Sequence, residues 1–257
     1  MSASQAQAAH VVVLAAGRGS RLGALGGQTP KWLLPVAGRP IADRHLAGLA
    51  AAAPHVASVR VVTGHAAPAI RRFLAGRSRP PAVDVVPNPD FEALNNWWSL
   101  LLALRELPED GPVAVVNGDL LTHPDWLSGF LADAAEGDRE GLLAVDTERT
   151  LTDESMKVAL APDGTLARIG KVDVPDPVGE YVGILAARGE VLRALRARLE
   201  EFVGREEAAN EWYEGALGKT AADGLPWHIW TTPGSGWVEI DDDDDLSAAE
   251  ALAGPPC

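Results

Sequence analysis

The sequence predicts an α/β fold with one domain, built on a mixed, mostly parallel central sheet flanked by helices. Three observations predict it. Apolar, valine-rich runs alternate with helical segments through residue 135. A glycine-rich turn follows the first apolar run directly. Beyond about residue 140 a hairpin signal interrupts the alternation, which predicts an inserted antiparallel region.

Strands and helices alternate in the first half of the chain. Apolar, β-branched runs of strand length occupy residues 10–15, 58–63, 82–86 and 113–116. Segments of helical pattern follow them or lie between them, at residues 41–53, about 68–74, 95–107 and 124–135. Because a strand–helix–strand unit places its two strands parallel, this half predicts a parallel sheet.

The second half has a different pattern. Strands are expected at 141–146, 157–161, 165–169 and 180–186, and Pro162, Asp163 and Gly164 form a turn signal between the second and third of them. Helices are expected at 191–202 and 210–222, followed by short strands at 228–231 and 237–240 and a last helix at 245–252. We expect a flexible tail at 1–9 and a single domain over 10–257.

The charge of the chain excludes several classes of partner. Its 257 residues include 22 Lys and Arg against 36 Asp and Glu, a net charge of −14. Nucleic acids and anionic membranes select basic surfaces, so neither is expected as a partner. The one cysteine, Cys257, excludes an intrachain disulfide and fits a reducing cytoplasm. No apolar run approaches the ~20 residues that span a bilayer, and we expect a cytoplasmic protein.

The most specific motif is the glycine-rich turn LAAGRGSRL, residues 14–22, with Pro30 and Lys31 soon after it. A glycine turn at the end of a strand exposes backbone N–H groups that hold phosphate, and Arg21 and Lys31 supply cations. A Walker A motif is absent, and Leu22 stands where a dinucleotide-binding motif needs its third glycine. A tight turn with incidental cations is the alternative.

LAAGRGSRL followed by PKWLLPVAGRPI resembles the signature of the nucleotidyltransferases that make nucleoside-diphosphate sugars and alcohols. The segments VVNGD (115–119), EYVGI (180–184) and WVEID (237–241) also resemble family motifs and occur in the family's order. NNWWSL (95–100) is similar to the cytidylyltransferases that act on phosphocholine, inositol phosphate and phosphonates such as 2-aminoethylphosphonate. The sugar-1-phosphate enzymes of the family usually carry a longer segment before the Pro-Lys pair, and residues 23–28 do not match it well.

The resemblance implies a Rossmann-like domain that binds nucleotide through about residues 10–135 and a phosphorylated acceptor through about 141–235. It implies that Asp119 and Asp241 bind Mg²⁺ and that Arg21 and Lys31 are catalytic, whereas Glu239 as a ligand stays open. The nucleotide-binding residues it implies are Leu14, Ala15, Ala16, Gly17, Gly19, Ser20, Asn88, Asn95, Ser99 and Asp119. Helix capping and turn formation are the alternative roles of Asn88, Asn95 and Ser99.

The acceptor-binding residues that the resemblance implies are Lys157, Lys171, Glu180, Tyr181, Glu214 and Trp98. Carboxylates and aromatic rings together suit a cationic amine. Surface lysines, core aromatic residues and a solvated helix face are the alternative interpretations.

The leading hypothesis is Mg²⁺-dependent transfer of CMP from CTP to a small phosphorylated alcohol or phosphonate, with release of pyrophosphate. A sugar-1-phosphate nucleotidyltransferase using UTP, dTTP or GTP is the first alternative, and a non-catalytic nucleotide-sensing subunit is the second. The partners implied are CTP and the acceptor. The oligomeric state is open, with a homodimer as one alternative.

Overall fold

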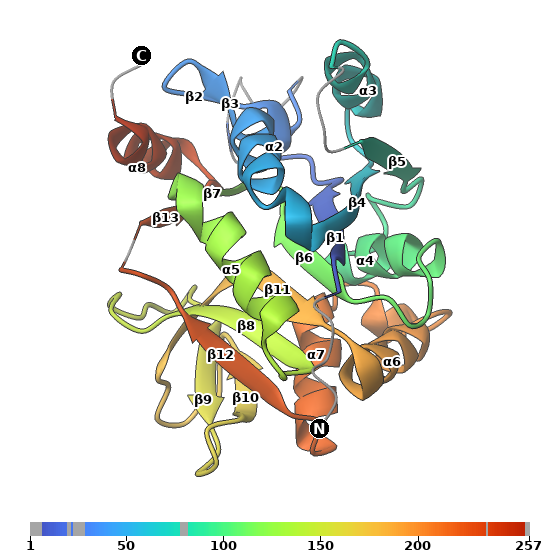
Figure 1. Ribbon diagram of the computed structural model, residues 1–257, viewed down its shortest axis with the longest axis vertical. Helices are drawn as coiled ribbons and strands as arrows, with labels where there is room; N and C mark the ends of the chain where they lie inside the picture. Colours follow the sequence, from blue (N-terminus) through green and yellow to red (C-terminus); the bar gives the residue numbers. More distant parts are fainter. Residues whose placement is uncertain (1–6, 20–21, 23–28, 78–81, 235, 255–257) are drawn as a thin grey trace.

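The computed structural model describes residues 7–19, 22, 29–77, 82–234 and 236–254 (Figure 1). Ser20, Arg21 and the predicted spacer 23–28 therefore lie outside the described residues. No helix in the described part of the chain is long and apolar enough to cross a membrane.

Four parallel strands form one half of the main sheet. They are β1 (Ala9–Ala15), β4 (Val56–Thr63), β5 (Val83–Pro87) and β6 (Val113–Asn117), in the order β6-β1-β4-β5. In β1, Val11 and Val13 belong to one core cluster and Val12 to the other. A continuous apolar run forms this strand because it must be buried on both faces of the sheet.

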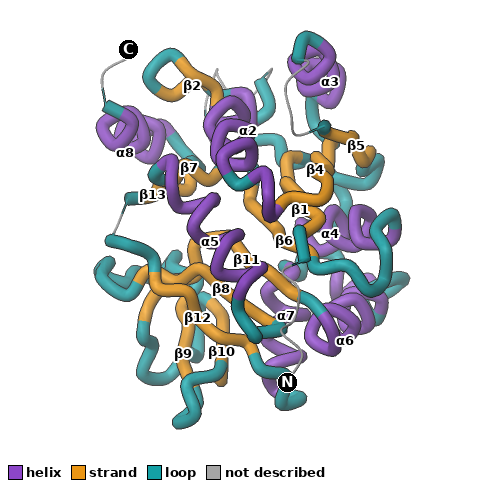
Figure 2. Tube along the Cα trace, in the orientation of Figure 1, coloured by secondary structure: helices purple, strands orange, loops and turns teal. Residues whose placement is uncertain are grey.

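Helices cover both faces (Figure 2). The described α-helices are α2 (Ile41–Ala51), α3 (Ala67–Ala75), α4 (Asn96–Arg105), α5 (Pro124–Glu136), α6 (Gly189–Glu200), α7 (Tyr213–Ala222) and α8 (Asp243–Ala253). Leu49 of α2 and Phe130 of α5 pack in the core cluster of one face. Leu100 of α4, Leu195 of α6 and Leu217 of α7 pack in the cluster of the other.

The other half of the sheet is mainly antiparallel. The long strand β11 (Gly179–Ala187) pairs antiparallel with β6, with β8 (Gly141–Asp146) and with β9 (Lys157–Leu160). Strand β10 (Leu166–Gly170) forms a hairpin with β9, and β12 (Trp227–Thr231) runs parallel to β8. The predicted fold class is confirmed: a mixed, mostly parallel sheet flanked by helices and extended by an antiparallel region.

Two small sheets lie outside the main one. Strand β7 (Leu120–Thr122) pairs antiparallel with β13 (Trp237–Glu239), and β2 (Pro35–Val36) pairs with β3 (Arg39–Pro40). Short 3₁₀ turns lie at η1 (Lys31–Leu33), η2 (Ala53–His55) and η3 (Glu206–Ala208). The β7–β13 pair matters most, because it joins a loop near the middle of the chain to a segment near its end.

The prediction of a helix over 210–222 is wrong at its start. Helix α7 begins at Tyr213, because the backbone before it bonds to the loop that leads into α4. The amide of Asn95 donates to the carbonyl of Ala209 at 2.9 Å, and the Asn95 side chain donates to the carbonyl of Asn210 at 3.1 Å. These tertiary hydrogen bonds replace the first helical turn that the sequence pattern favours.

Candidate functional site

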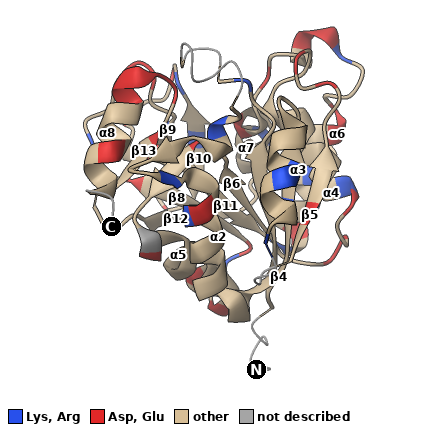
Figure 3. Cartoon of the chain, turned by 90° about the horizontal axis from the view of Figure 1, so that it is seen from above, with Lys and Arg blue, Asp and Glu red and all other residues tan. Residues whose placement is uncertain are grey.

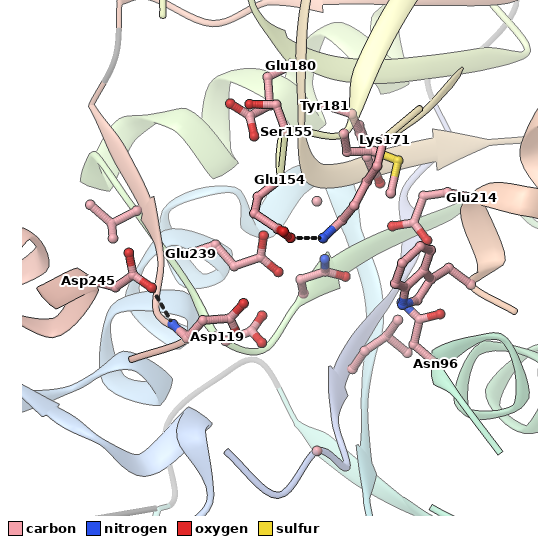
Figure 4. Close-up of a pocket in the computed structure, with 18 of the residues that line it drawn as sticks. Asn96, Asp119, Glu154, Ser155, Lys171, Glu180, Tyr181, Glu214, Glu239 and Asp245 are labelled. Carbon is pink, nitrogen blue, oxygen red and sulfur yellow. Dashed lines mark hydrogen bonds and ion pairs between the residues drawn. The ribbon is translucent and has the colours of Figure 1, made fainter. Parts of the chain in front are cut away.

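A cavity of about 620 Å³ opens at the carboxyl ends of the parallel strands (Figure 4). Its walls come from the loop after β1, the turn after β6, the start of α4, the loop between β8 and β9, and the segment from β13 into α8. Ligands of open α/β sheets bind at this edge, so the topology places the cavity where the chemistry is expected.

Lys31 lies beside the cavity and contacts two of the carboxylates that line it. Its Nζ donates to Asp119 Oδ2 at 3.2 Å and to Asp241 Oδ1. Asp119 follows β6 and Asp241 follows β13, and the amide of Ile240 donates to the Asp119 carbonyl at 3.0 Å. The small β7–β13 sheet therefore holds the two carboxylates together around one ammonium group.

The glycine turn packs directly against this lysine. Gly19 has φ +62°, and a Cβ there would lie 2.9 Å from Cγ of Lys31. Both the left-handed backbone and the close approach require glycine at this position. The second glycine of the predicted motif thus supports the Lys31 side chain.

The charged groups of the cluster shift one another's pKa values. Burial by itself lowers the pKa of Lys31, but the charges of Asp119 and Asp241 and their hydrogen bonds outweigh it, so the pKa is raised. Glu239 faces the cavity on the same segment, and its side chain stays exposed there although protein atoms surround it. Burial raises the pKa of Glu239, and the nearby charges of Asp119 and Asp241 raise it further. The site thus holds an excess of negative charge that a cation would relieve.

Asp119 and Asp241 could hold a divalent metal ion, because their carboxylates converge on one point that Lys31 Nζ reaches. Within the described residues, no three His, Cys, Asp or Glu side chains come together as a metal cage. A two-carboxylate site fits Mg²⁺, which binds proteins through one or two carboxylates and completes its shell with water and phosphate oxygens.

The other side of the cavity is lined by glutamates. Glu154, Glu180, Glu214 and Glu239 point into it (Figure 4). Lys171 Nζ donates to Glu154 Oε2 at 2.8 Å and lies 5.2 Å from the centre of the Trp212 ring. This wall offers acidic oxygens and an indole face, the pair of features that binds organic cations.

Glu214 is the most deeply buried of these carboxyl groups. Its side chain is 7% exposed, and Oε2 has no hydrogen-bond partner within the described residues. Burial raises the pKa of Glu214 to about 7. Beside it, the hydroxyl of Tyr213 lies 3.0 Å from that of Tyr181 and donates to Asn117 Oδ1 at 3.2 Å. A buried polar network thus supports the cavity floor.

The cavity brings together many of the residues that sequence reasoning selected. Its lining includes Leu14, Ala16, Gly17, Asn95, Ser99, Asp119, Lys171, Glu180, Tyr181, Glu214 and Asp241. Ala15, Gly19 and Lys31 belong to the adjoining turn and cluster and do not line the cavity within the described residues. Ser20 and Arg21 lie outside the described residues, so the predicted role of Arg21 stays a prediction.

Three predicted residues are engaged elsewhere. Asn88 is buried and donates to Ser99 Oγ at 2.9 Å, and Trp98 donates to Asp90 Oδ2 at 3.2 Å. Lys157 Nζ donates to the Lys171 carbonyl at 2.8 Å. In the described part of the chain none of the three lines the cavity. Asn95 lines it and also caps α4, its Oδ1 accepting from the amide of Asn96 at 2.7 Å.

Sequence reasoning assigned no role to several cavity residues, among them Asn96, Asn117, Arg149 and Trp237. Asn117 could have been found from its place directly before Gly118 and Asp119. Arg149 carries no sequence signal, because its loop has neither a glycine turn nor a regular period.

The family model described as "MobA-like NTP transferase domain" matches residues 11–214. The CMP-5'-(3-aminopropyl)phosphonate synthase of Streptomyces rubellomurinus is 33% identical over 96% of this chain and 39% of its own length. The bifunctional protein GlmU of Alkalilimnicola ehrlichii is 32% identical over 96% of this chain and 51% of its own length. The chain therefore spans about half or less of these relatives.

The solved structures agree on the fold. The CTP:phosphocholine cytidylyltransferase from Streptococcus pneumoniae superposes with a TM-score of 0.77 at 17% identity, over 96% of this chain and 100% of that one. At this identity the likeness concerns the fold alone. With a family model that matches most of the chain and relatives above 30% identity, this protein belongs to the MobA-like NTP transferase domain family of nucleotidyltransferases.

Proposed function

We propose that this protein transfers CMP from CTP to a small phosphorylated alcohol or phosphonate and releases pyrophosphate, with Mg²⁺ as its metal. One observation carries the proposal: Lys31 between Asp119 and Asp241 adjoins a cavity whose far wall is acidic and aromatic. The cluster of Lys31, Asp119 and Asp241 suits a nucleoside triphosphate with its metal ion. The acidic and aromatic wall suits an acceptor that carries a cationic amine.

An oxygen of the acceptor's phosphate or phosphonate attacks the α-phosphorus of CTP, and the bond to the pyrophosphate breaks. This oxygen is anionic at neutral pH, so the reaction needs no general base. The protein's task is positioning and charge neutralisation. Lys31, kept protonated by the two aspartates, neutralises charge that builds up at the α-phosphate. Arg21 stays our candidate for the β- and γ-phosphates.

Asp119 and Asp241 would hold the Mg²⁺ ion, which when bound withdraws charge from the phosphate oxygens. Backbone groups at Ala16 and Gly17 face the cavity and suit the nucleotide. The backbone amide of His65 donates a hydrogen bond to the Ala16 carbonyl at 3.0 Å, which fixes the backbone path of the turn. The name of the Streptomyces relative, CMP-5'-(3-aminopropyl)phosphonate synthase, supports both the CMP donor and the aminated acceptor.

A second candidate is transfer of a nucleotide to a sugar 1-phosphate, with UTP, dTTP or GTP as donor. The GlmU protein of Alkalilimnicola ehrlichii, 32% identical over 96% of this chain, favours it. The excess of glutamates in the acceptor wall disfavours it, because a neutral sugar leaves those charges uncompensated.

The test is pyrophosphate release with Mg²⁺, each of the four NTPs, and a panel of acceptors. The panel holds 2-aminoethylphosphonate, 3-aminopropylphosphonate, phosphocholine, inositol 1-phosphate and glucose 1-phosphate. Turnover with CTP and a non-sugar acceptor is the expected result. Turnover only with glucose 1-phosphate and an NTP other than CTP would contradict this proposal and support the sugar-1-phosphate nucleotidyltransferase instead.

A further inference from the structure

The cavity has a pronounced imbalance of charge. Its described walls carry eight carboxylates and two cations, Arg149 and Lys171. An acceptor phosphate or phosphonate brings further negative charge into this space. Binding such an anion therefore requires a cation whose charge is not already balanced by a nearby carboxylate.

Lys171 is already engaged. Its ammonium pairs with Glu154 at 2.8 Å and lies on the face of Trp212. The charge of Lys171 also reaches the buried Glu214 carboxyl. An ammonium balanced in this way is poorly placed to neutralise an incoming anion.

Arg149 is in a different situation. The charge of Arg149 reaches the Glu180 carboxyl, where it opposes the rise in pKa that burial causes. Within the described residues, however, its guanidinium makes no ion pair and no side-chain hydrogen bond. Its Cζ lies 4.6 Å from the centre of the Trp237 ring. Stacking on an aromatic face holds a guanidinium while leaving the N–H groups at its edge free for the two oxygens of a phosphate. Trp237 is two residues from Glu239 and four from Asp241, so the Arg149 guanidinium packs against the segment that carries the proposed metal ligand.

A buried carboxylate holds this arrangement in place. Asp146 is fully buried, and its Oδ2 accepts from Trp237 Nε1 at 2.8 Å. Its Oδ1 accepts from the backbone amides of Glu148 at 2.8 Å and Arg149 at 3.1 Å. One side chain therefore fixes both the backbone of Arg149 and the ring on which its guanidinium rests.

We propose that Arg149 binds the anionic phosphate or phosphonate group of the acceptor, with Trp237 and Asp146 as its positioning residues. This inference rests on the proposed function, since it assigns a group of the acceptor to one end of the cavity. The anion would then lie beside β13 and the Asp119–Lys31–Asp241 cluster. The rest of the acceptor would extend toward the glutamates.

The experiment compares wild type with Arg149→Met, Arg149→Lys and Trp237→Phe. KM and kcat are measured with CTP and 2-aminoethylphosphonate, or with glucose 1-phosphate if wild type uses only that acceptor. Arg149→Met is expected to raise the acceptor KM about 10- to 100-fold, the range for a lost charge-assisted hydrogen bond. The KM for CTP is expected to stay within about twofold of the wild-type value, because Arg149 is not expected to contact CTP. Arg149→Lys is expected to restore part of the loss.

The positioning residues have their own readout. Trp237→Phe keeps a ring but removes the indole donor, and Asp146→Asn cannot accept from both the indole and the two amides. Both are expected to raise the acceptor KM less than Arg149→Met does. Arg168→Met, at an exposed arginine of β10, is the matched control and is expected to behave as wild type. An acceptor KM in Arg149→Met equal to that of wild type would overturn the inference.

Calorimetry with 2-aminoethylphosphonate and glucose 1-phosphate separates the two proposals. Binding of either by wild type but not by Arg149→Met, without turnover, would support the inference and contradict the proposed function. Turnover by wild type with unchanged binding by Arg149→Met would overturn the inference alone. If wild type neither binds nor converts any acceptor of the panel, both proposals fail.

Discussion

Lys31 stands 88 positions before Asp119 and 210 before Asp241, yet its ammonium contacts both carboxylates. The motifs PKWLLPVAGRPI, VVNGD and WVEID contain these three residues, so the sequence alone identifies them. The motifs do not identify the residues of the glutamate-lined wall, which we propose for the acceptor. Arg149 lies in an irregular loop, and Trp98 and Lys157 have neighbours that only the fold supplies.

Substituting Asp119 tests the metal site that we propose. Asp119→Asn keeps the size of the side chain but removes the charge that balances Lys31 and would bind Mg²⁺. We expect kcat to fall about 100-fold or more, the usual cost of losing one electrostatic contact to the transition state. Pyrophosphate release measures it, and a thermal melt close to that of wild type establishes that the fold is intact. Asp125→Asn, whose side chain is 88% exposed, is the matched control. Undiminished turnover in Asp119→Asn would remove this residue from the mechanism.

Glu214 makes stability depend on pH. Burial raises its pKa to about 7 from the ordinary value of 4.5. Between these values the folded chain holds a proton that the unfolded chain has released. The contribution of Glu214 to the free energy of unfolding therefore falls as pH rises from 4.5 to 7 and is constant above that window.

Glu214→Gln removes the buried charge and keeps a polar group of the same size. We expect the variant to be more stable than wild type at pH 8, by about 1–3 kcal/mol, and to lose that advantage at pH 5. Urea unfolding at the two pH values measures the difference. Glu211→Gln, at an exposed position of the same segment, controls for the loss of one negative charge. An equal effect of Glu214→Gln at both pH values would contradict the burial argument.

At the scale of elements, periodicity predicts those that bury one continuous face. The valine-rich strands and the amphipathic helices match their predicted positions closely, since burial against the sheet decides them. Periodicity does not predict short elements, because they contain too few residues to show a pattern. Strand β7 has three residues, and it exists because β13 pairs with it from the far end of the chain. The same pairing builds the site, so the least predictable element is also the one that completes it.

The start of α8 shows how an element positions a functional residue. Acidic residues gather there (Figure 3). Asp242 caps the helix by accepting from the amides of Asp244 and Asp245, each at 3.0 Å. Asp245 Oδ2 in turn accepts from the amides of Asp241 at 2.9 Å and Asp242 at 3.2 Å. This capping box fixes the backbone of Asp241 at the cavity.

Removing the cap is expected to weaken the helix. Asp242→Ala deletes the side-chain acceptor and should lower the free energy of unfolding by about 1 kcal/mol. Asp244→Ala removes a charge from the same helical turn and leaves the capping hydrogen bonds in place, so its cost should be smaller. Urea unfolding of both variants gives the comparison. Equal losses would mean that charge near the helix start, rather than the cap, provides the stability.

At the scale of the whole molecule, a parallel half and an antiparallel half share strand β11 and meet at one cavity. The alternation of strands and helices predicts the first half, and the turn at 162–164 predicts the hairpin of the second. How the halves meet depends on long-range pairings that no local pattern contains. The predicted division at about residues 135–141 into nucleotide and acceptor parts stays a prediction.

The most direct measurement is ³¹P nuclear magnetic resonance of the products formed from CTP, Mg²⁺ and 2-aminoethylphosphonate. The account predicts pyrophosphate together with a new pair of coupled signals, from a phosphonate phosphorus joined through oxygen to the phosphorus of CMP. It also predicts that Asp119→Asn forms neither within the same time. Hydrolysis of CTP without a coupled product, or no reaction with any acceptor of the panel, would contradict it.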